Sequence, residues 1–182
     1  MLYSGMEDVL LRRVKTLKPS GQLNFSVLAP IHGLSLVVGS TFPPEDPIRQ
    51  IEMEPDEGVP GFFGNRKVPG FSPAAWKVNE LEGRTVFDRA GQPIGEASPL
   101  RAVNKGKISV AEKWLYCRPI FERSTTTPWS NRLVGTLLVH SRADDANSLF
   151  KTEEFQHLVD SVASEASPYL DAIQIIMAEE KP

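Results

Sequence analysis

Apolar residues are densest in the C-terminal half of the chain, where their pattern predicts two strands. The first covers Ile108–Phe121, and its firm part is Trp114–Phe121 because the polar pair Glu112-Lys113 interrupts the apolar run. The second, Leu133–His140, follows a polar, turn-rich connection. Pro119 has no N–H to donate to a neighbouring strand, so the first strand is either at a sheet edge or bulged at this point.

Alternation along the first strand divides its side chains between two faces of a sheet. One face carries Trp114, Tyr116, Arg118 and Ile120, and the other carries Leu115, Cys117 and Phe121.

A long amphipathic helix is predicted from Thr152 to about residue 178. Thr152 suits the N-cap, and the two glutamates that follow it complement the helix dipole. The apolar positions then recur at steps of three and four, at Phe155, Val159, Val162, Ala166, Tyr169, Ile173 and Ile176. This stripe either packs on the domain's own sheet or joins a bundle with the N-terminal helix and a second copy, and we favour the bundle. At Pro168 the helix either kinks or restarts with Ser167 as its cap.

The N-terminal part predicts a helix over residues 6–17, which ends before a Pro-Ser-Gly breaker. Apolar residues then alternate over Leu23–Val27, and Leu34–Ser40 forms a second apolar run. Pro30–Gly33 lies between them as a turn, so the two runs predict a hairpin.

The middle of the chain is rich in proline and glycine, which disfavours long regular elements. Gly58–Gly64 still suits one short helix with Pro60 in its first turn. Four aromatic residues between 62 and 76 indicate packing rather than disorder, so we expect this segment to cover one face of a sheet. Gly91–Pro93 and Ala97–Gly106 are interpreted as connections. The order of elements predicts an α+β fold: one domain over residues 1–182, with an antiparallel sheet, the terminal helices on one face and irregular loops on the other.

Composition excludes several classes of function. The net charge is −3 and no basic stripe occurs, so no nucleic-acid partner is expected. No apolar run is long enough to span a bilayer, and residues 1–9 lack the apolar core of a secretory signal, so no direct membrane insertion is expected. The chain has one cysteine, Cys117, which agrees with a reducing compartment and a cytoplasmic location.

Three stretches resemble one known family. Glu57–Gly61 is similar to a short acidic-glycine entry into a helix, and Trp114–Ile120 resembles a penultimate strand that ends in proline and an aliphatic residue. Arg132–Val139, followed by Phe150–Glu154, resembles a last strand that leads into a terminal helix. On these stretches the chain resembles a GAF domain. The likeness is firmest over residues 108–175, and residues 65–107 match nothing in the family closely.

The resemblance implies a central antiparallel sheet with a small-molecule pocket under loops, and a sensory or regulatory role. GAF domains bind cyclic nucleotides, bilins, haem, anions or metabolites, and many act as dimerising relays without a known ligand. Asn147 and Phe150 only echo the cyclic-nucleotide motif, whose lysine is missing here. Cys117 lacks the neighbouring histidine of a bilin site, and a single cysteine cannot cycle as the several cysteines of the free methionine sulfoxide reductases do.

Aromatic and basic residues form the candidate ligand site, because pockets are mostly apolar with a few polar anchors. The candidates are Phe62, Phe63, Arg66, Trp76, Trp114, Tyr116 and Arg118. The arginines are placed to receive an anionic group. The alternative is a purely structural role, in which these rings form a second small core under the loops.

No catalytic constellation, metal-ligand spacing or phosphate-binding loop occurs, so we expect no catalytic or metal site and no enzyme, and the cofactor is unknown. The expected function is a sensory or regulatory domain that binds a small ligand and relays it through the terminal helices, as a homodimer. One alternative is a ligand-free interaction or dimerisation module of a larger signalling or transcription-regulating protein. A second alternative is a redox enzyme that uses Cys117.

Overall fold

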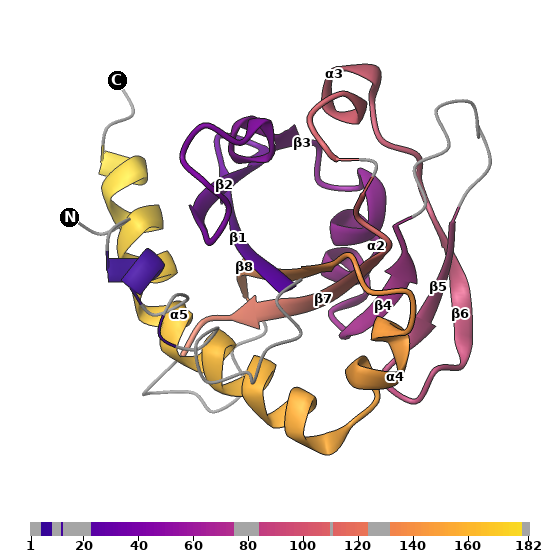
Figure 1. Cartoon of the computed structure of the whole chain (residues 1–182). Coiled ribbons are helices and arrows are strands. Elements are labelled where there is room, and N and C mark those ends of the chain that lie inside the picture. The colour runs from indigo at the N-terminus through magenta and orange to yellow at the C-terminus, as the bar shows by residue number, and fades with distance from the viewer. Residues whose placement is uncertain are drawn as a thin grey trace.

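An eight-stranded antiparallel sheet forms the centre of the computed structural model, which describes residues 5–8, 12, 23–74, 84–109, 111–123 and 132–179. The strand order is β3-β2-β1-β8-β7-β4-β5-β6 (Figure 1). The strands are β1 (Leu23–Ile31), β2 (Leu34–Ser40), β3 (Glu52–Met53), β4 (Gly70–Pro73), β5 (Arg84–Asp88), β6 (Pro93–Ala97), β7 (Trp114–Phe121) and β8 (Leu133–Ser141). The labelled helices are η1 (Pro47–Gln50), α2 (Gly58–Arg66), α3 (Ala102–Lys105), α4 (Ala146–Phe150) and α5 (Glu153–Glu179).

The predicted N-terminal hairpin is confirmed as β1 and β2, which pair in antiparallel fashion. Its turn places His32 and Gly33 at positive φ, 50° and 84°. Two successive residues at positive φ match the right-handed twist of the strands, and glycine adopts this conformation without a steric cost.

Strand β8 confirms the second predicted C-terminal strand, and β7 confirms the firm part of the first, Trp114–Phe121, while residues 108–109 and 111–113 are not in a strand. The predicted alternation along β7 holds. Tyr116 and Ile120 belong to the core beneath α5, whereas Leu115 and Cys117 belong to the core on the opposite face. Pro119 lies beyond the last β7 residue that pairs with β4, and the β7–β8 register shifts just after it, between Ile120 and Phe121. The missing N–H therefore falls where the ladder on one side has already ended.

The middle of the chain is more regular than its composition predicts. The predicted connection at Gly91–Pro93 contains the turn of a hairpin, but its strands β5 and β6, which extend the sheet through β4, are not predicted. The predicted connection over Ala97–Gly106 joins β6 to the short helix α3. The Asp88 carboxylate accepts a hydrogen bond from the Gln92 N–H, and Gly91 adopts a φ of 84° in the turn. This turn explains how short, weakly apolar strands pair in a region rich in glycine and proline.

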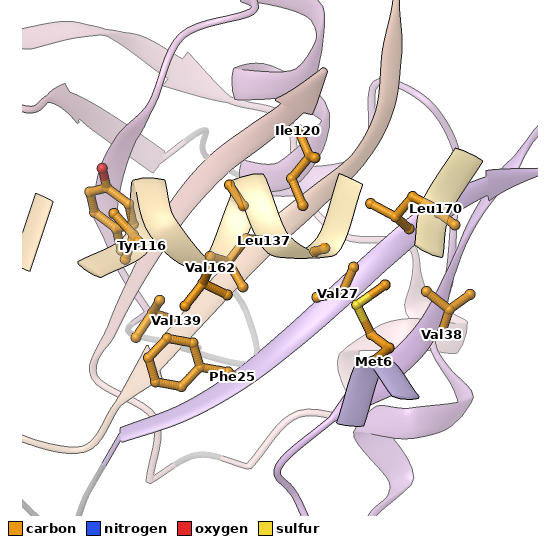
Figure 2. Packing of buried hydrophobic residues seen from close by; sticks show 14 of the residues in the cluster. Met6, Phe25, Val27, Val38, Tyr116, Ile120, Leu137, Val139, Val162 and Leu170 are labelled. Atoms are coloured by element: carbon orange, nitrogen blue, oxygen red, sulfur yellow. The ribbon is translucent and has the colours of Figure 1, made fainter. Parts of the chain in front are cut away.

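Helix α5 packs across β7, β8 and β1 and buries most of the predicted stripe against the domain's own sheet. Figure 2 shows Val162 and Leu170 of α5 over Val27, Leu137 and Val139. Residues 5–8 are helical, and Met6 is fully buried in the same core. Most of the predicted helix over residues 6–17 lies outside the described residues.

Pro168 neither ends α5 nor starts a new segment, since the helix continues through it to Glu179. Pro168 is exposed, and the preceding hydroxyl does not cap a helix: Ser167 Oγ donates to the Phe121 carbonyl of β7 at 2.9 Å. The alternative of a second helix capped by Ser167 is thus ruled out. The N-cap prediction is confirmed, because Thr152 Oγ1 accepts from the Phe155 N–H at 3.3 Å.

The other face of the sheet is covered by η1, α2, α3 and the loops between them, as the α+β prediction requires (Figure 1). Helix α2 confirms the predicted short helix, with Pro60 in its first turn. Beneath this cover lies a second apolar core that includes Leu28 of β1, Leu115 of β7 and Leu138 of β8. The candidate site lies within this core.

Candidate functional site

A cavity of about 40 Å³ lies between the sheet and its loop cover. Its floor comes from β1, β2, β7 and β8, and its roof from η1, the first turn of α2 and the segment over residues 98–108. The apolar lining comprises Leu28, Val37, Ile48, Ile51, Met53, Val59, Leu100, Ile108, Leu115 and Leu138. A space of this size holds a few waters or a small chemical group in the closed state.

Glu112 brings a buried carboxylate to this cavity, whose lining is mainly apolar. Its side chain is only 1% exposed, and Oε1 accepts a hydrogen bond from Arg142 Nε at 2.9 Å. The second oxygen, Oε2, has no hydrogen-bond partner among the described residues. Burial raises the pKa of Glu112, with a smaller upward contribution from Asp46, while Arg142 lowers it.

His140 lies on the same wall, at the end of β8. Alternation sends Leu138 and His140 to the loop face, and the imidazole meets the Phe42 ring edge-on at a centroid distance of 5.1 Å. Its Nε2 atom is buried without a hydrogen-bond partner among the described residues. Burial lowers the pKa of His140 to about 3, so the imidazole is neutral at neutral pH.

The roof is held down by one buried carboxylate, that of Glu57, which is 3% exposed. It accepts hydrogen bonds from the backbone N–H of Glu54 and Arg101, from Arg101 Nε and from Asn104 Nδ2. Burial alone raises the pKa of Glu57, but these hydrogen bonds outweigh it and the net pKa is lowered. The segment over residues 98–108, which carries Leu100 over the cavity, is thereby fastened to the start of α2. We call this segment the cover segment.

The sequence-predicted site residues on α2 lie beside this cavity, not in it. Phe63 is buried in the core under the loops, and Phe62 packs edge-on against it. The Arg66 guanidinium lies over the Phe62 ring at 4.6 Å, next to Gly95 of β6. These three residues form one contiguous cluster outside the cavity lining. Trp76 lies outside the described residues.

The three predicted site residues on β7 lie on the opposite face of the sheet, so the expectation of one pocket containing all of them is corrected. Tyr116 is fully buried beneath α5, and its hydroxyl contacts Gln156 Oε1 at 3.0 Å. Arg118 Nε donates to Asp160 of α5 at 2.7 Å. Trp114 Nε1 donates to the Asp144 carbonyl at 2.9 Å. Strand alternation, which the sequence analysis had assigned correctly, is the reason: the cavity side of β7 is the Leu115 side.

Glu112 and His140 are therefore not among the predicted site residues, although the sequence contains a signal that each is buried on the cavity face. Glu112 interrupts an apolar run, and His140 ends one at the position that alternation assigns to the same face as Leu138. A polar residue on the buried face of a strand is more informative than another aromatic residue, since burying it is costly without a partner.

Cys117 is buried in the loop-face core and is not part of the cavity lining. Burial raises its pKa well above the ordinary value, so the thiolate that reacts with electrophiles is scarce. This environment does not favour the Cys117-dependent redox alternative. Among the described residues, no group of three or more His, Cys, Asp or Glu side chains is placed to hold a metal ion. No helix in the same part of the chain combines the length and hydrophobicity needed to cross a bilayer.

No protein-family model matches this chain, and no curated protein sequence does. Solved structures do match, and they have the GAF fold. The GAF domain from an Acinetobacter phosphoenolpyruvate-protein phosphotransferase aligns with a TM-score of 0.60 and 14% identity, over 96% of this chain and 85% of that one. The GAF domain of a two-component sensor histidine kinase from Bacillus halodurans aligns with a TM-score of 0.56 and 8% identity, over 93% and 95%. The chain thus has a GAF-like fold, as its sequence resemblance predicts.

An enzyme also shares this fold. The type II free methionine-R-sulfoxide reductase from Thermoplasma acidophilum aligns with a TM-score of 0.56 and 10% identity, over 94% of this chain and 96% of that one. The prediction that the chain is not an enzyme is therefore wrong, because this fold does not exclude catalysis: a protein with the same architecture is a catalyst. Identities this low show the shared fold alone.

Proposed function

We propose that this protein is a sensory or regulatory domain that binds a small ligand in the cavity between the sheet and its cover. The observation that carries the proposal is a pair of buried polar atoms on the lining of one mainly apolar cavity, Glu112 Oε2 and His140 Nε2, neither of which has a hydrogen-bond partner among the residues that the structure describes. Buried polar groups are nearly always hydrogen-bonded, so a cavity with two unsatisfied ones favours an occupant that supplies the missing partners. The GAF domains among its structural neighbours support a sensory role of this general kind.

Arg49 supports the relay part of the proposal, because it joins the cavity wall to the N-terminal segment. Its neighbour in η1, Ile48, lines the cavity. The Arg49 guanidinium donates to the carbonyls of Ser40, Phe42 and Pro43, and its Nη1 donates to Glu7 Oε1 at 2.6 Å. Displacement of η1 by a ligand would therefore pull on residues 5–8.

Residues 5–8 lie against α5, which completes the proposed route to the terminal helices. A Cβ atom on Gly5 would lie 2.7 Å from the Tyr169 ring, so the two segments are in close contact. Near its end α5 exposes Ile175 and Ile176, 59% and 43% exposed. We propose that a second copy covers this end in a homodimer located in the cytoplasm.

Thermal unfolding in the presence of a library of nucleotides, amino acids, amines, anions and haem tests the ligand-binding part. A binder raises the midpoint as its concentration exceeds its dissociation constant. The matched control is a variant with the cavity filled, Val59→Phe, which should lose the response while it keeps the fold. A library without a single responder, together with a cavity that contains only water at high resolution, would favour the ligand-free interaction module.

Hydrogen exchange tests the relay. A responder from the library should change the exchange of residues 5–8 and of the last turns of α5, neither of which lines the cavity. In Arg49→Gln the ligand should still bind, but the change at residues 5–8 should be lost because the link to Glu7 is broken. An unchanged response in this variant would remove Arg49 from the route.

A further inference from the structure

We propose that the cavity ligand is a small aliphatic amine, whose protonated amino group is received by Glu112 Oε2 and His140 Nε2 while its hydrocarbon part lies among the apolar side chains of the lining. This inference rests on the proposed function and names the chemical class of its ligand. It is carried by the chemistry of the lining, which offers buried hydrogen-bond acceptors within an aliphatic wall.

Glu112 sets the charge of the ligand. Its Oε1 is occupied by Arg142, whose side chain is 45% exposed and which approaches from the solvent side. Its Oε2 is buried and has no hydrogen-bond partner in the described part of the chain, and an ionised carboxylate oxygen only accepts hydrogen bonds. A charge-assisted N–H donor is its strongest partner, and a ligand carboxylate or phosphate would be repelled there.

Two further acceptors line the same cavity. His140 is neutral, so its imidazole can accept an N–H through Nε2. Ser26 of β1 also lines the cavity, and its hydroxyl is engaged with Ser40 Oγ at 3.1 Å, which leaves it acceptor capacity. Ser26 pairs with Leu138, two residues from His140, so the two are diagonal neighbours on adjacent strands. A primary ammonium group has three N–H donors, and the lining offers three acceptors.

The rest of the lining selects the body of the ligand. Most of the wall is formed by leucine, isoleucine, valine and methionine side chains, and none of the rings at Phe62, Phe63 or Trp114 lines the cavity. Arg84 and Ser98 also line the cavity, and Arg84 already has an interaction partner of its own. An aliphatic chain of a few carbons matches this surface. Because the closed cavity has a volume of only about 40 Å³, entry requires the cover segment to lift. Glu57 holds this segment through its carboxylate, and the Glu52 and Gln50 carbonyls accept further hydrogen bonds from it.

The test compares two probes with the same branched carbon skeleton and opposite charge, isobutylamine and isobutyrate, added to the full chain at constant ionic strength and near neutral pH. Titration followed by methyl NMR should give saturable shifts at the methyls of Leu115 and Leu138 with isobutylamine and none with isobutyrate. Intermolecular contacts between the probe methyls and these leucines in the wild-type protein locate the site without any variant.

Two variants separate contact from general electrostatics. Glu112→Gln keeps the shape but replaces one acceptor with an N–H₂ group, and it should raise the dissociation constant of isobutylamine by at least about tenfold. Asp46→Asn removes a nearby negative charge that is not part of the lining, and it should change this constant by less than about threefold. Each variant's midpoint without ligand reports whether it still folds.

Three results would overturn the amine assignment. They are equal binding of both probes, binding of isobutylamine that Glu112→Gln leaves unchanged, and a wild-type cavity that takes up only water at saturating amine. If another class from the library binds this cavity, the assignment of the amine fails while the proposed sensory function stands. If no class binds, both fail.

Discussion

Single residues account for most of the chemistry of this domain, and His140 is the clearest case. Its imidazole is buried against Phe42 with one nitrogen unsatisfied, so the folded state resists its protonation. A histidine of this kind links folding to pH, because the unfolded chain binds a proton that the folded chain excludes.

We expect the protein to lose stability on mild acidification. Burial lowers the pKa of His140 from 6.5 to about 3. Its contribution is therefore fully present above the unfolded pKa and is lost as the pH falls below it. The expected loss in the free energy of unfolding from this group is about 2 kcal/mol between about pH 7 and about pH 5. Urea unfolding at several pH values measures it.

The variant His140→Phe isolates this term, since it keeps an aromatic ring beside Phe42 but cannot titrate. Glu112, whose pKa is raised by burial, acts in the opposite direction, because its folded form takes up a proton first. It does so in both proteins, so the difference between their pH profiles reports His140. Parallel profiles would show that the imidazole is not protected from protonation.

At the scale of elements, two attachments matter most: the cover segment is fastened to α2, and α5 is seated on β8. The first attachment depends on Glu57 and four hydrogen bonds to its carboxylate. The second depends on a close approach at Gly135, where an added Cβ would lie 2.6 Å from Leu170 Cδ1 and 2.6 Å from the Leu28 carbonyl oxygen.

Glu57→Gln should destabilise the fold by about 1–3 kcal/mol. The substitution replaces one buried carboxylate oxygen, which accepts hydrogen bonds, with an amide N–H₂ group that would point at the N–H donors of the same network. Glu54→Gln is the matched control. The Glu54 side chain also pairs with Arg101, but it is 53% exposed, so its loss should cost no more than about 0.5 kcal/mol. Denaturant unfolding compares the two, and equal effects would show that Glu57 is not the fastening of the cover segment.

Gly135→Ala should cost about 1–3 kcal/mol, since either Leu170 or the strand must shift to admit the methyl group. At Gly106, by contrast, an added Cβ would meet nothing within 4 Å, and the φ of −73° suits any residue. Gly106→Ala should therefore be neutral or gain up to about 1 kcal/mol. Thermal unfolding checks the pair, and a tolerated alanine at 135 would indicate that α5 is seated less tightly than described.

The sequence predicted the elements whose apolar pattern is strong and missed those that depend on neighbours. The β1–β2 hairpin, β7, β8 and α5 were predictable because period and turn chemistry agree over each of them. Strands β5 and β6 were not, because they are short and acquire their stability from pairing on β4. The observed cavity differs from the predicted site for a related reason. An aromatic residue marks a pocket only where its strand turns it toward that pocket, and the alternation of β7 places Tyr116 and Arg118 beneath α5.

For the whole molecule, the exposed end of α5 is the feature that bears on assembly. The apolar stripe of α5, which we expected to form a bundle, packs against the sheet of the same chain as far as Ile173. Beyond this point Ile175 and Ile176 are exposed, and Ile175 lines the same surface hollow as His32 and Gly33 of the β1–β2 turn. The proposed dimer must therefore use only the last turns of α5.

The double variant Ile175→Glu/Ile176→Glu should convert a dimer to a monomer at high micromolar concentration, because charges at the interface oppose its burial. Val103→Glu is the control, since Val103 is equally exposed, at 59%, but lies on α3 in the cover segment and not on α5. Light scattering gives the mass in each case. A monomeric wild-type protein at these concentrations would remove the dimer from the proposed function.

The position of Cys117 has a practical consequence. Because this single thiol is enclosed by the loop-face core, it should react only slowly with maleimide reagents in the native protein. Cysteines introduced at exposed positions of α5 and of the cover segment could then carry fluorophores or spin labels without removal of the native one. The distance between the cover segment and the terminal helix could be measured in this way.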